Sequence, residues 1–506
     1  MQIIMWDNRW LYLNNLTADV ENLIDDHFSA KDPSSVYIDD SMSQHWDGVY
    51  HRYNSNKQRL SKGYLNDLLK LCDDKHIPVE IDDRRPPSKY PMFSKSDIKS
   101  NIMSGIVLEK HQLEALEACT TNEIGLFHHI TGAGKTEVIC AIAKLLQCPT
   151  LIIAEETIVV KQIRDRLKLR DVVDDVGMFY AGVTPEDQLV CVGSLQSIMS
   201  PPGKITSKTS EKRKKAIKTR ANNAKKYKEL VKRCELLMVD EADKCCNKVY
   251  RKLIMQYCNA RYIYGFTGTV PDPKDEPIEY LNMRELVGNV ISSANRRYLE
   301  SIGRIIPVKC IMMTFGPNQK NNKAAFDIAV SRWIKNNKKF HDQVKFITDS
   351  FPKDNFLILV EDVALGLSLE KLIDGSKFIY GKTSKKQRDN AIKSFENGEM
   401  RILIGSKILK RGLDIDGGVD NVILCASSKN SRDLEQKIGR AVRVNERKWA
   451  RIFDFMFICS HYLYQHSRKR LRMMVSLGYP TTVVTPNADF DGKDVLKRGF
   501  NIFRYV

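Results

Sequence analysis

The chain has 506 residues, 42% of them hydrophobic and 28% charged, which is enough for roughly two to four domains with buried cores. Its 80 basic residues against 62 acidic residues give a net charge of +18, which favours a polyanionic partner such as nucleic acid or an acidic membrane surface. Twelve cysteines without a C-x-x-C pair argue against a zinc ribbon or a disulfide framework. The chain has neither a long apolar run nor the layout of a signal peptide, so we expect a soluble protein of the cytoplasm.

Residues 1–95 are expected to form a small α+β domain. One stretch, KGYLNDLLKLCDD at 62–74, repeats its apolar residues at helical spacing. The short strand-like runs around it are 35–39, 49–53 and 77–81. The following segment, 82–97, contains two adjacent prolines, a third nearby and many charges, so it is predicted to be a linker.

From about residue 105, apolar strand-like runs alternate with helical patterns. The runs of the first series are IGLFHHI, PTLIIAE, DQLVCVG, ELLMVDE and YIYGFTGT, and those of the second are VKCIMMTF, FLILVED, SKFIYGK, RILIGSK, DNVILCA and ARIFDFM. Uninterrupted apolar runs are typical of parallel strands that helices cover on both faces. The pattern predicts two successive α/β domains, 96–305 and 306–455, and a short helical C-terminal extension at 456–506.

A strongly basic segment interrupts the first α/β domain at 203–233. It holds thirteen lysine and arginine residues against two glutamates, and so carries +11 of the total charge. A solvated helix or loop without a specific role is one interpretation. Because the segment is an insertion and not a tail, we favour a contact with nucleic acid. The candidate contacts are Lys212, Arg213, Lys214 and Lys215.

The stretch HITGAGKT at 129–136 matches the phosphate-binding pattern G-x-x-x-x-G-K-[ST], except that His129 stands where the first glycine is expected. A strand-like run precedes it and a helical pattern follows it, as the motif requires. Backbone N–H groups and the helix N-terminus would bind phosphate. Lys135 would reach the outer phosphates of ATP, and Thr136 would offer its hydroxyl to Mg²⁺. The predicted contacts are His129, Ile130, Thr131, Gly132, Ala133, Gly134, Lys135 and Thr136.

Two carboxylates directly follow the apolar run LLMV. An acidic pair at the end of a buried strand is costly unless it meets a cation, and nucleotide-bound Mg²⁺ is the expected one. Asp240 is therefore predicted to hold the metal, and Glu241 to orient and deprotonate the attacking water. A helix-capping acidic turn is the alternative interpretation.

The stretch DLEQKIGRAVR places three polar side chains, Gln436, Arg440 and Arg443, on one face of a predicted helix. Arginines that one domain projects toward a phosphate held by another act as arginine fingers, typically worth roughly 10³ to 10⁵ in rate. Taken without the other motifs, this pattern favours a basic solvated helix.

These motifs, in this order, resemble those of superfamily 2 helicases and translocases from about 105 to 455. LEKHQLEA, HITGAGKT, LIIAEETIVVKQ, VGSLQSI, DEAD, GFTGT, ILIGSKILKRGLDI and QKIGRAVR are similar to eight of the family's motifs. The resemblance implies two tandem RecA-like domains with ATP between them and nucleic acid across both, and a side chain such as His129 is tolerated in the loop. It also implies an adenine contact by Gln112, nucleic-acid contacts by Ser194, Gln196 and Arg411, and nucleotide contacts by Gly412 and Asp414.

The chain departs from the RNA-unwinding branch of the family, because it has TGT at motif III and QKIGRAVR at motif VI. Its N-terminal region, from QHWDGVY to EIDD, resembles the small leading domain of UvsW-type phage helicases, which remodel branched DNA. Arg52, with Trp46, Tyr50 and Tyr53, would then form a basic and aromatic DNA-binding surface. For Trp46 itself, we favour the alternative role of a core residue in the small domain.

We therefore expect an ATP-dependent DNA helicase or translocase that remodels branched or forked DNA in recombination and repair. An RNA helicase of the DEAD-box type, and a non-unwinding DNA motor subunit of a larger complex, are the alternatives. The expected cofactors are ATP and Mg²⁺. The expected partner is branched, forked or single-stranded DNA, bound by a monomer in the cytoplasm, which is the host cytoplasm for a phage protein, with recombination or replication proteins as further partners.

Overall fold

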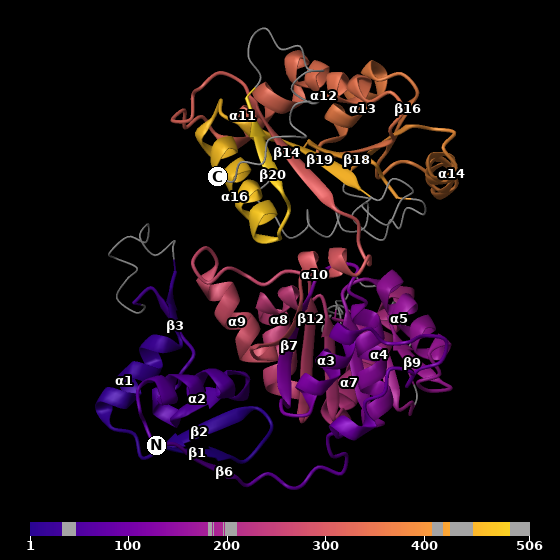
Figure 1. Ribbon diagram of the computed structural model, residues 1–506. Coiled ribbons are helices and arrows are strands. Elements are labelled where there is room, and N and C mark those ends of the chain that lie inside the picture. Colours follow the sequence, from indigo (N-terminus) through magenta and orange to yellow (C-terminus); the bar gives the residue numbers. More distant parts are fainter. Residues whose placement is uncertain are drawn as a thin grey trace. The chain divides into compact units, whose positions relative to one another are not determined.

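The computed structural model describes residues 1–32, 47–180, 185, 187–195, 197, 210–406, 418–425 and 449–485 (Figure 1). The chain divides into two compact units. One comprises Met1–Ile130 and Gly134–Ala294, and the other comprises Thr131–Ala133 and the chain from Asn295 onward. The N-terminal region thus belongs to the same compact unit as the first large α/β domain.

The first large domain contains a seven-stranded, all-parallel sheet. Its strands, in spatial order, are β13 (Val290–Ala294), β7 (Ile124–His129), β12 (Tyr262–Thr267), β11 (Leu236–Asp240), β8 (Thr150–Ala154), β10 (Val190–Ser194) and β9 (Val176–Phe179). The five predicted apolar runs all form strands here. The two edge strands escape the sequence pattern, because β9 has only four residues and VISSA of β13 contains two serines and has a single buried residue.

Both faces of this sheet are apolar, so both carry a layer of helices. Neighbouring residues point to opposite faces: Phe127 belongs to one core and Leu126 to the other. The first core also contains residues of α3, α4 and α5, and the second contains residues of α7, α8 and α9 (Figure 1). The bounds are α3 (Lys110–Cys119), α4 (Lys135–Leu146), α5 (Thr157–Leu169), α7 (Glu211–Arg233), α8 (Lys248–Lys252) and α9 (Pro277–Val287).

The second compact unit contains another seven-stranded parallel sheet. Its order is β16 (Ser376–Ile379), β17 (Ile402–Gly405), β15 (Phe356–Val360), β18 (Asn421–Cys425), β19 (Ala450–Phe457), β14 (Val308–Phe315) and β20 (Thr481–Val484). All six predicted runs form strands. Helices of this unit are α10 (Arg296–Ser301), α11 (Phe326–Val330), α12 (Lys338–Ser350), α13 (Val363–Leu372), α14 (Lys385–Glu396) and α16 (His461–Ser476). Two tandem RecA-like parallel-sheet domains are thereby confirmed.

The segment expected as a C-terminal extension contributes to this second sheet. Strand β20 pairs in parallel with β14, so the sheet continues to Val484, beyond the boundary expected at 455. Helix α16 packs on β19, and its fully buried Arg470 forms a two-pronged ion pair with the buried Asp454, at 2.9 and 3.1 Å. The sequence pattern misses this link because the partners lie sixteen residues apart on different elements.

The N-terminal region forms a small α+β domain, as predicted. Its sheet has the order β5 (Arg59–Ser61), β2 (Trp10–Asn14), β1 (Gln2–Met5) and β6 (Glu80–Asp83), and the other elements are α1 (Ala18–His27), α2 (Leu65–Asp74) and the hairpin of β3 (Ser29–Lys31) and β4 (Val49–His51). The predicted helix at 62–74 corresponds to a short 3₁₀ turn followed by α2. The run 35–39 and Trp46 lie outside the described residues.

This small domain is fixed to α9 of the first large domain through backbone carbonyls near the helix C-terminus. Tyr64 donates its hydroxyl to the carbonyl of Leu281 at 2.8 Å, and Ser61 donates to the carbonyl of Glu285 at 2.7 Å. Between these two residues, a Cβ atom at Gly63 would collide with the same stretch of α9 backbone. Only glycine permits this close approach of two chain segments.

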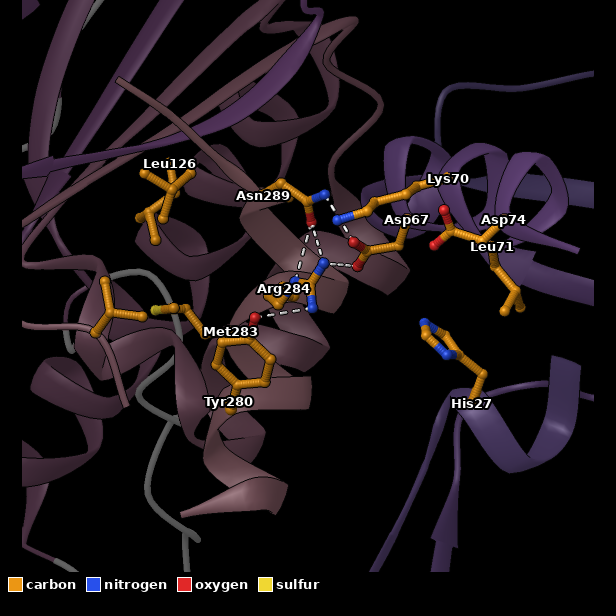
Figure 2. A pocket seen from close by; sticks show the side chains of 13 residues that line it. His27, Asp67, Lys70, Leu71, Asp74, Leu126, Tyr280, Met283, Arg284 and Asn289 are labelled. Atoms are coloured by element: carbon orange, nitrogen blue, oxygen red, sulfur yellow. Dashed lines mark hydrogen bonds and ion pairs between the residues drawn. The ribbon is translucent and has the colours of Figure 1, made fainter. Parts of the chain in front are cut away.

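Charged side chains continue this interface from α2. Asp67 pairs with Arg284 of α9 and accepts a 2.8 Å hydrogen bond from the amide of Asn289, which in turn accepts two hydrogen bonds from Arg284 (Figure 2). The network borders a cavity of about 450 Å³, into which His27 and Lys70 also face. Polar groups, and not only apolar contact, therefore connect the two domains.

Arg52 belongs to this interface and not to an exposed nucleic-acid surface, which corrects the sequence-based expectation. Only 10% of its side chain is exposed. The guanidinium donates to the amide oxygen of Asn282 on α9 and lies 4.0 Å from the carboxylate of Glu285. Tyr53 is buried as well, with its hydroxyl bonded to Glu21. Sequence composition alone cannot tell a basic residue at a domain interface from one on a free surface.

Candidate nucleotide site

The strand order of the first sheet brings three predicted motifs to one edge. Strand β12 lies between β7 and β11, and all three run parallel, so the loops that follow them leave the same edge of the sheet. In the register, Thr267 of β12 pairs with His128 of β7, and Phe266 pairs with Asp240 of β11. The phosphate loop, the acidic pair and the GFTGT segment are therefore neighbours, as the sequence motifs predict.

The loop between β7 and α4 has the backbone geometry that phosphate binding requires. Gly132 and Gly134 adopt φ values of +93° and +76°, in the left-handed region that favours glycine. Helix α4 starts directly after Gly134, so its first N–H groups and its positive dipole end face the loop. Donors of this kind, beside a lysine, fit a polyphosphate.

Lys135 is the cation of this loop. Its ammonium group donates to the backbone carbonyl of His129 at 3.2 Å. This hydrogen bond holds the lysine side chain over the phosphate loop, which follows His129. A neutral carbonyl does not neutralise an ammonium group, so an anionic phosphate is a stronger partner for it. Thr136 is partly exposed on the first turn of α4.

The acidic pair lies at the end of β11. Asp240 is the last residue of the strand, and Glu241 adopts the left-handed conformation with φ of 56°. A glutamate in this region costs about 1–3 kcal/mol, and such strain is concentrated at functional sites. The following Asp243 is buried, 3.3 Å from the hydroxyl of Thr267, and so links this turn to the GFTGT segment.

Thr267 also organises its own segment. Its hydroxyl lies 2.9 Å from the carbonyl of Thr269 and accepts a 3.1 Å hydrogen bond from the backbone N–H of the same residue. Both threonines are buried. The GFTGT turn is thus a fixed structure between the other two loops and not an open linker.

The two histidines before the phosphate loop have different roles. His128 lies 3.1 Å, through Nε2, from the carbonyl of Gly268, so Nε2 must carry the proton. Burial lowers the pKa of His128, and Lys135 lowers it further, so the ring is neutral at pH 7. His128 therefore connects the phosphate-loop strand to the GFTGT segment. The sequence gives no signal for this residue beyond its position at the end of a strand.

His129, at the position of the missing glycine, is fully buried. Its Nε2 lies 2.9 Å from the hydroxyl of Ser292 on β13, and its ring packs edge-on against Phe127. Burial lowers the pKa of His129 to about 3, with smaller contributions from His111 and Lys135. The side chain points into the domain and leaves the loop backbone clear, which explains how this position accepts a large residue.

Gln112, the predicted adenine contact, is buried on α3 beside the phosphate loop. Its side-chain oxygen accepts a 2.9 Å hydrogen bond from the N–H of Glu109, within a capping box at the start of the helix. A Cβ atom at Gly134 would collide with the amide nitrogen of Gln112. The amide of Gln112 therefore lies directly against the phosphate loop at Gly134.

The other predicted site residues fall into three groups. Ser194 is buried at the end of β10, 2.9 Å from the hydroxyl of Ser197. Arg213 and Lys215 are exposed on α7 and Lys214 is half-buried, whereas the side chain of Lys212 lies outside the described part. Gln196, Arg411, Gly412, Asp414, Gln436, Arg440 and Arg443 also lie outside the described residues.

Within the described ranges, no cluster of three or more histidine, cysteine or acidic side chains is arranged to hold a metal ion by itself. None of the helices described there combines the length and apolar character that a membrane crossing requires. The cysteines carry no disulfide, and all but Cys246 are buried. Any Mg²⁺ at the acidic pair would therefore rely on nucleotide oxygens for part of its coordination.

A phosphate loop and an acidic pair on one edge of a RecA-like sheet, followed by a second sheet of the same kind, define a phosphate-loop NTPase with two RecA-like domains. The comparisons with known proteins specify the class further. Residues 105–272 match the family "Type III restriction enzyme, res subunit", and residues 338–445 match "Helicase conserved C-terminal domain". Both matches support a helicase of superfamily 2.

Its relatives are distant. The DNA 3′-5′ translocase XPB2 of Sulfurisphaera tokodaii is 22% identical over 418 residues, which are 72% of this chain and 87% of that protein. The DNA-bound structure of the ATP-dependent Type ISP restriction-modification enzyme LlaBIII is similar with a TM-score of 0.52 and 12% identity, over 77% of this chain and 32% of that one. The structure of T4 UvsW is similar with a TM-score of 0.44 and 16% identity, over 96% and 99% of the two chains. Other curated relatives are matched over only 40% and 44% of their length.

Proposed function

We propose that this protein is an ATP-dependent DNA helicase or translocase that remodels branched or forked DNA. The observation that carries the proposal is the shared edge of the first sheet, where the phosphate loop and the acidic pair flank the GFTGT segment. Such an edge serves nucleotide hydrolysis, and the second RecA-like domain supplies the partner that a motor of this superfamily needs.

In the proposed site, the loop residues and the N-terminus of α4 bind the phosphates of ATP, and Lys135 carries the positive charge among them. Thr136 and Asp240 hold Mg²⁺, which neutralises charge on the phosphates when it is bound. Glu241 accepts the proton of the attacking water. The left-handed backbone of Glu241 marks this position as strained, as expected at a functional site.

The second domain completes the proposed site through residues that the family motifs indicate. Arg440 and Arg443 act as arginine fingers, Gln436 of the same motif is a further catalytic residue, and Gly412 and Asp414 contact the nucleotide. Gln112 binds adenine from the first domain. Its place against the phosphate loop supports this role, since one side chain then touches both the base and the loop.

DNA is the proposed substrate because the Sulfurisphaera tokodaii relative, which matches 72% of this chain, is named as a DNA translocase. The TGT form of the GFTGT segment also departs from the RNA-unwinding branch. Ser194, Gln196 and Arg411 are the proposed backbone contacts. Ser194 supports this assignment by its place at the end of β10, on the same edge of the sheet as the nucleotide motifs.

A second candidate is a DNA motor that moves on duplex DNA without separating its strands, as a subunit of a larger complex. The match of residues 105–272 to the res subunit of type III restriction enzymes favours it. The two candidates share ATP hydrolysis and DNA binding, and they differ only in strand separation or branch migration.

The test compares ATP hydrolysis and strand separation on single-stranded DNA, forks, four-way junctions, linear duplex and RNA of equal length. A remodelling enzyme is stimulated most by forks or junctions and converts them to products. Stimulation by duplex without conversion supports the motor subunit. Strongest stimulation by RNA would falsify the DNA proposal and leave a DEAD-box type of RNA helicase.

A further inference from the structure

The basic insertion of the first domain is a single helix with two different faces. Helix α7, 23 residues long, carries eleven lysine and arginine residues and two glutamates, a net charge of +9. Its buried face is formed by Ile217, Tyr227, Leu230 and Val231, and the last three of these join the core on one face of the sheet. A helix without such a face would be solvated on all sides. Helix α7 is therefore packed into the domain as one of its structural elements.

Several contacts fix the C-terminal half of α7. Tyr227 packs against Phe179 of β9, with ring centroids 5.1 Å apart. Arg233 pairs with Asp187 at 2.7 Å and donates to the carbonyl of Gln188 at 3.2 Å. Lys228 lies 4.9 Å from the ring centroid of Tyr257. These contacts set which side of the helix faces outward.

The outward side carries a stripe of cations. Lys218, Lys225 and Lys232 are all exposed and follow one another at intervals of seven residues, or about 10.5 Å along the axis. Lys215 and Lys226 are also exposed on this side. The stripe contains no aromatic residue, and the helix's only aromatic residue, Tyr227, is buried.

The charge pattern has a cost for the isolated protein. Lysines three and four residues apart on one helix repel each other by about 0.2–0.5 kcal/mol per pair, and Glu229 is the only carboxylate of α7 beyond its first residue. A polyanion relieves this repulsion. A duplex carries one charge per about 1.7 Å of its axis, and α7, about 34 Å long, spans about one duplex turn.

We propose that the exposed face of α7 is a second DNA-binding site, which contacts the phosphate backbone of duplex DNA independently of base sequence. Single-strand binding sites use aromatic side chains on which bases stack, and this face has none. Duplex DNA is therefore the occupant that its chemistry fits. The site lies outside the nucleotide motifs, and its role would be to hold the duplex arm of the substrate.

The experiment measures the affinity of the full chain for a 30-base-pair duplex, without ATP, between 50 and 300 mM KCl. The variant replaces Lys218, Lys225 and Lys232 by glutamine, which keeps helix propensity and removes three charges. Each phosphate contact contributes about 0.9 to the log–log slope, so the slope falls by about 2 to 3. An unchanged slope overturns the proposal.

Glu229→Lys, on the same stripe, is the matched control with the opposite sign. We expect it to bind duplex more tightly than the wild type and to steepen the slope by up to about 1. If α7 had a purely structural role, both variants would bind duplex with equal or lower affinity than the wild type. That result would overturn the proposal. Thermal melting of each variant within about 2 °C of the wild type excludes unfolding as the cause.

Two further measurements complete the test. The first distinguishes a duplex-binding face from a membrane-binding face, and the second separates DNA binding by α7 from ATP hydrolysis at the nucleotide site. Binding to phosphatidylserine vesicles should be weak at 150 mM KCl, and strong vesicle binding that the triple variant alone loses would assign the face to a membrane. ATP hydrolysis by the wild type tests the proposed function separately, since duplex binding by α7 needs no hydrolysis. If the wild type does not hydrolyse ATP, but the triple variant still lowers the salt dependence of duplex binding, only the proposed function is refuted.

Discussion

Two partly buried charged regions of the first compact unit differ in how their charges are paired. Glu123, just before β7, receives three cations: Lys62, Arg85 at 2.8 Å and Arg261 at 2.7 Å. They come from the small domain, the predicted linker and the start of β12. Lys135, at the other end of β7, donates instead to the carbonyl of His129.

The difference separates a structural cluster from a functional one. Burial alone would raise the pKa of Glu123, but Lys62 and Arg85 hold it at about 2, so the carboxylate stays charged and fixes three chain segments. Lys135 holds a neutral acceptor that phosphate outcompetes. A charge that is paired with an opposite charge of its own domain stabilises the fold. A charge whose partner is a neutral carbonyl can still pair with an anionic ligand.

The largest expected effect is on activity. Lys135→Ala removes the cation of the phosphate loop, so ATP hydrolysis should fall below detection, while the melting temperature stays within about 2 °C because no buried anion loses its partner. Lys144→Ala, on the same helix α4, is the matched control and should keep turnover. Measurable hydrolysis by the Lys135 variant would remove this lysine from the site.

The second expected effect is on stability. Glu123→Gln leaves three cations without their shared carboxylate, so the free energy of unfolding should fall by about 3–5 kcal/mol. Glu117→Gln on α3, an exposed partner of Lys95 at 3.8 Å, should cost less than about 1 kcal/mol. Urea unfolding measures both. Equal effects in the two variants would mean that the cluster does not join the segments.

The same carboxylate predicts a pH dependence. Because the pKa of Glu123 is lowered from 4.5 to about 2 in the folded protein, its contribution is complete above pH 4.5 and is lost as the pH falls toward 2. The wild type should therefore lose stability more steeply than Glu123→Gln across this range. Parallel curves would contradict the pairing. Urea midpoints at pH 5.0, 4.0 and 3.0 provide the comparison.

The smallest effect concerns the link between the two loops. His128→Leu removes the 3.1 Å hydrogen bond to the carbonyl of Gly268, worth about 0.5–1.5 kcal/mol, so DNA-stimulated hydrolysis should fall by roughly two- to tenfold in kcat with little change in KM for ATP. His128→Gln keeps a donor and should recover part of the loss. A change in KM alone would make His128 a binding residue and not a link.

The sequence predicted the strands and the nucleotide motifs well because each depends on neighbouring residues. All eleven apolar runs are strands, since a strand buried on both faces needs apolar side chains throughout. Of the four edge strands of the two large sheets, the sequence predicted β16 and missed β9, β13 and β20. An edge strand has one neighbour only and need not be apolar throughout, so the pattern is a weaker guide there.

Interfaces were the other gap. The linker prediction at 82–97 did not indicate that Arg85 is 4% exposed and bonded to Glu123, and Arg52 gave no sign of facing α9. His128 likewise looked like any strand residue. Each of these side chains acquires its role from a partner 38 or more residues away in the chain, which spacing patterns do not record.

By itself, the sequence determined that the chain has a phosphate loop, an acidic pair and two parallel-sheet domains, because these are encoded in short runs of residues. Only the tertiary structure decided which cations serve the fold and which face outward. Arg52, Lys62 and Arg85 are held by carboxylates or amides of other elements, whereas Lys218, Lys225 and Lys232 are exposed. The physical reason is that the role of a charge depends on burial and on its partner, and both are set by elements distant in the sequence.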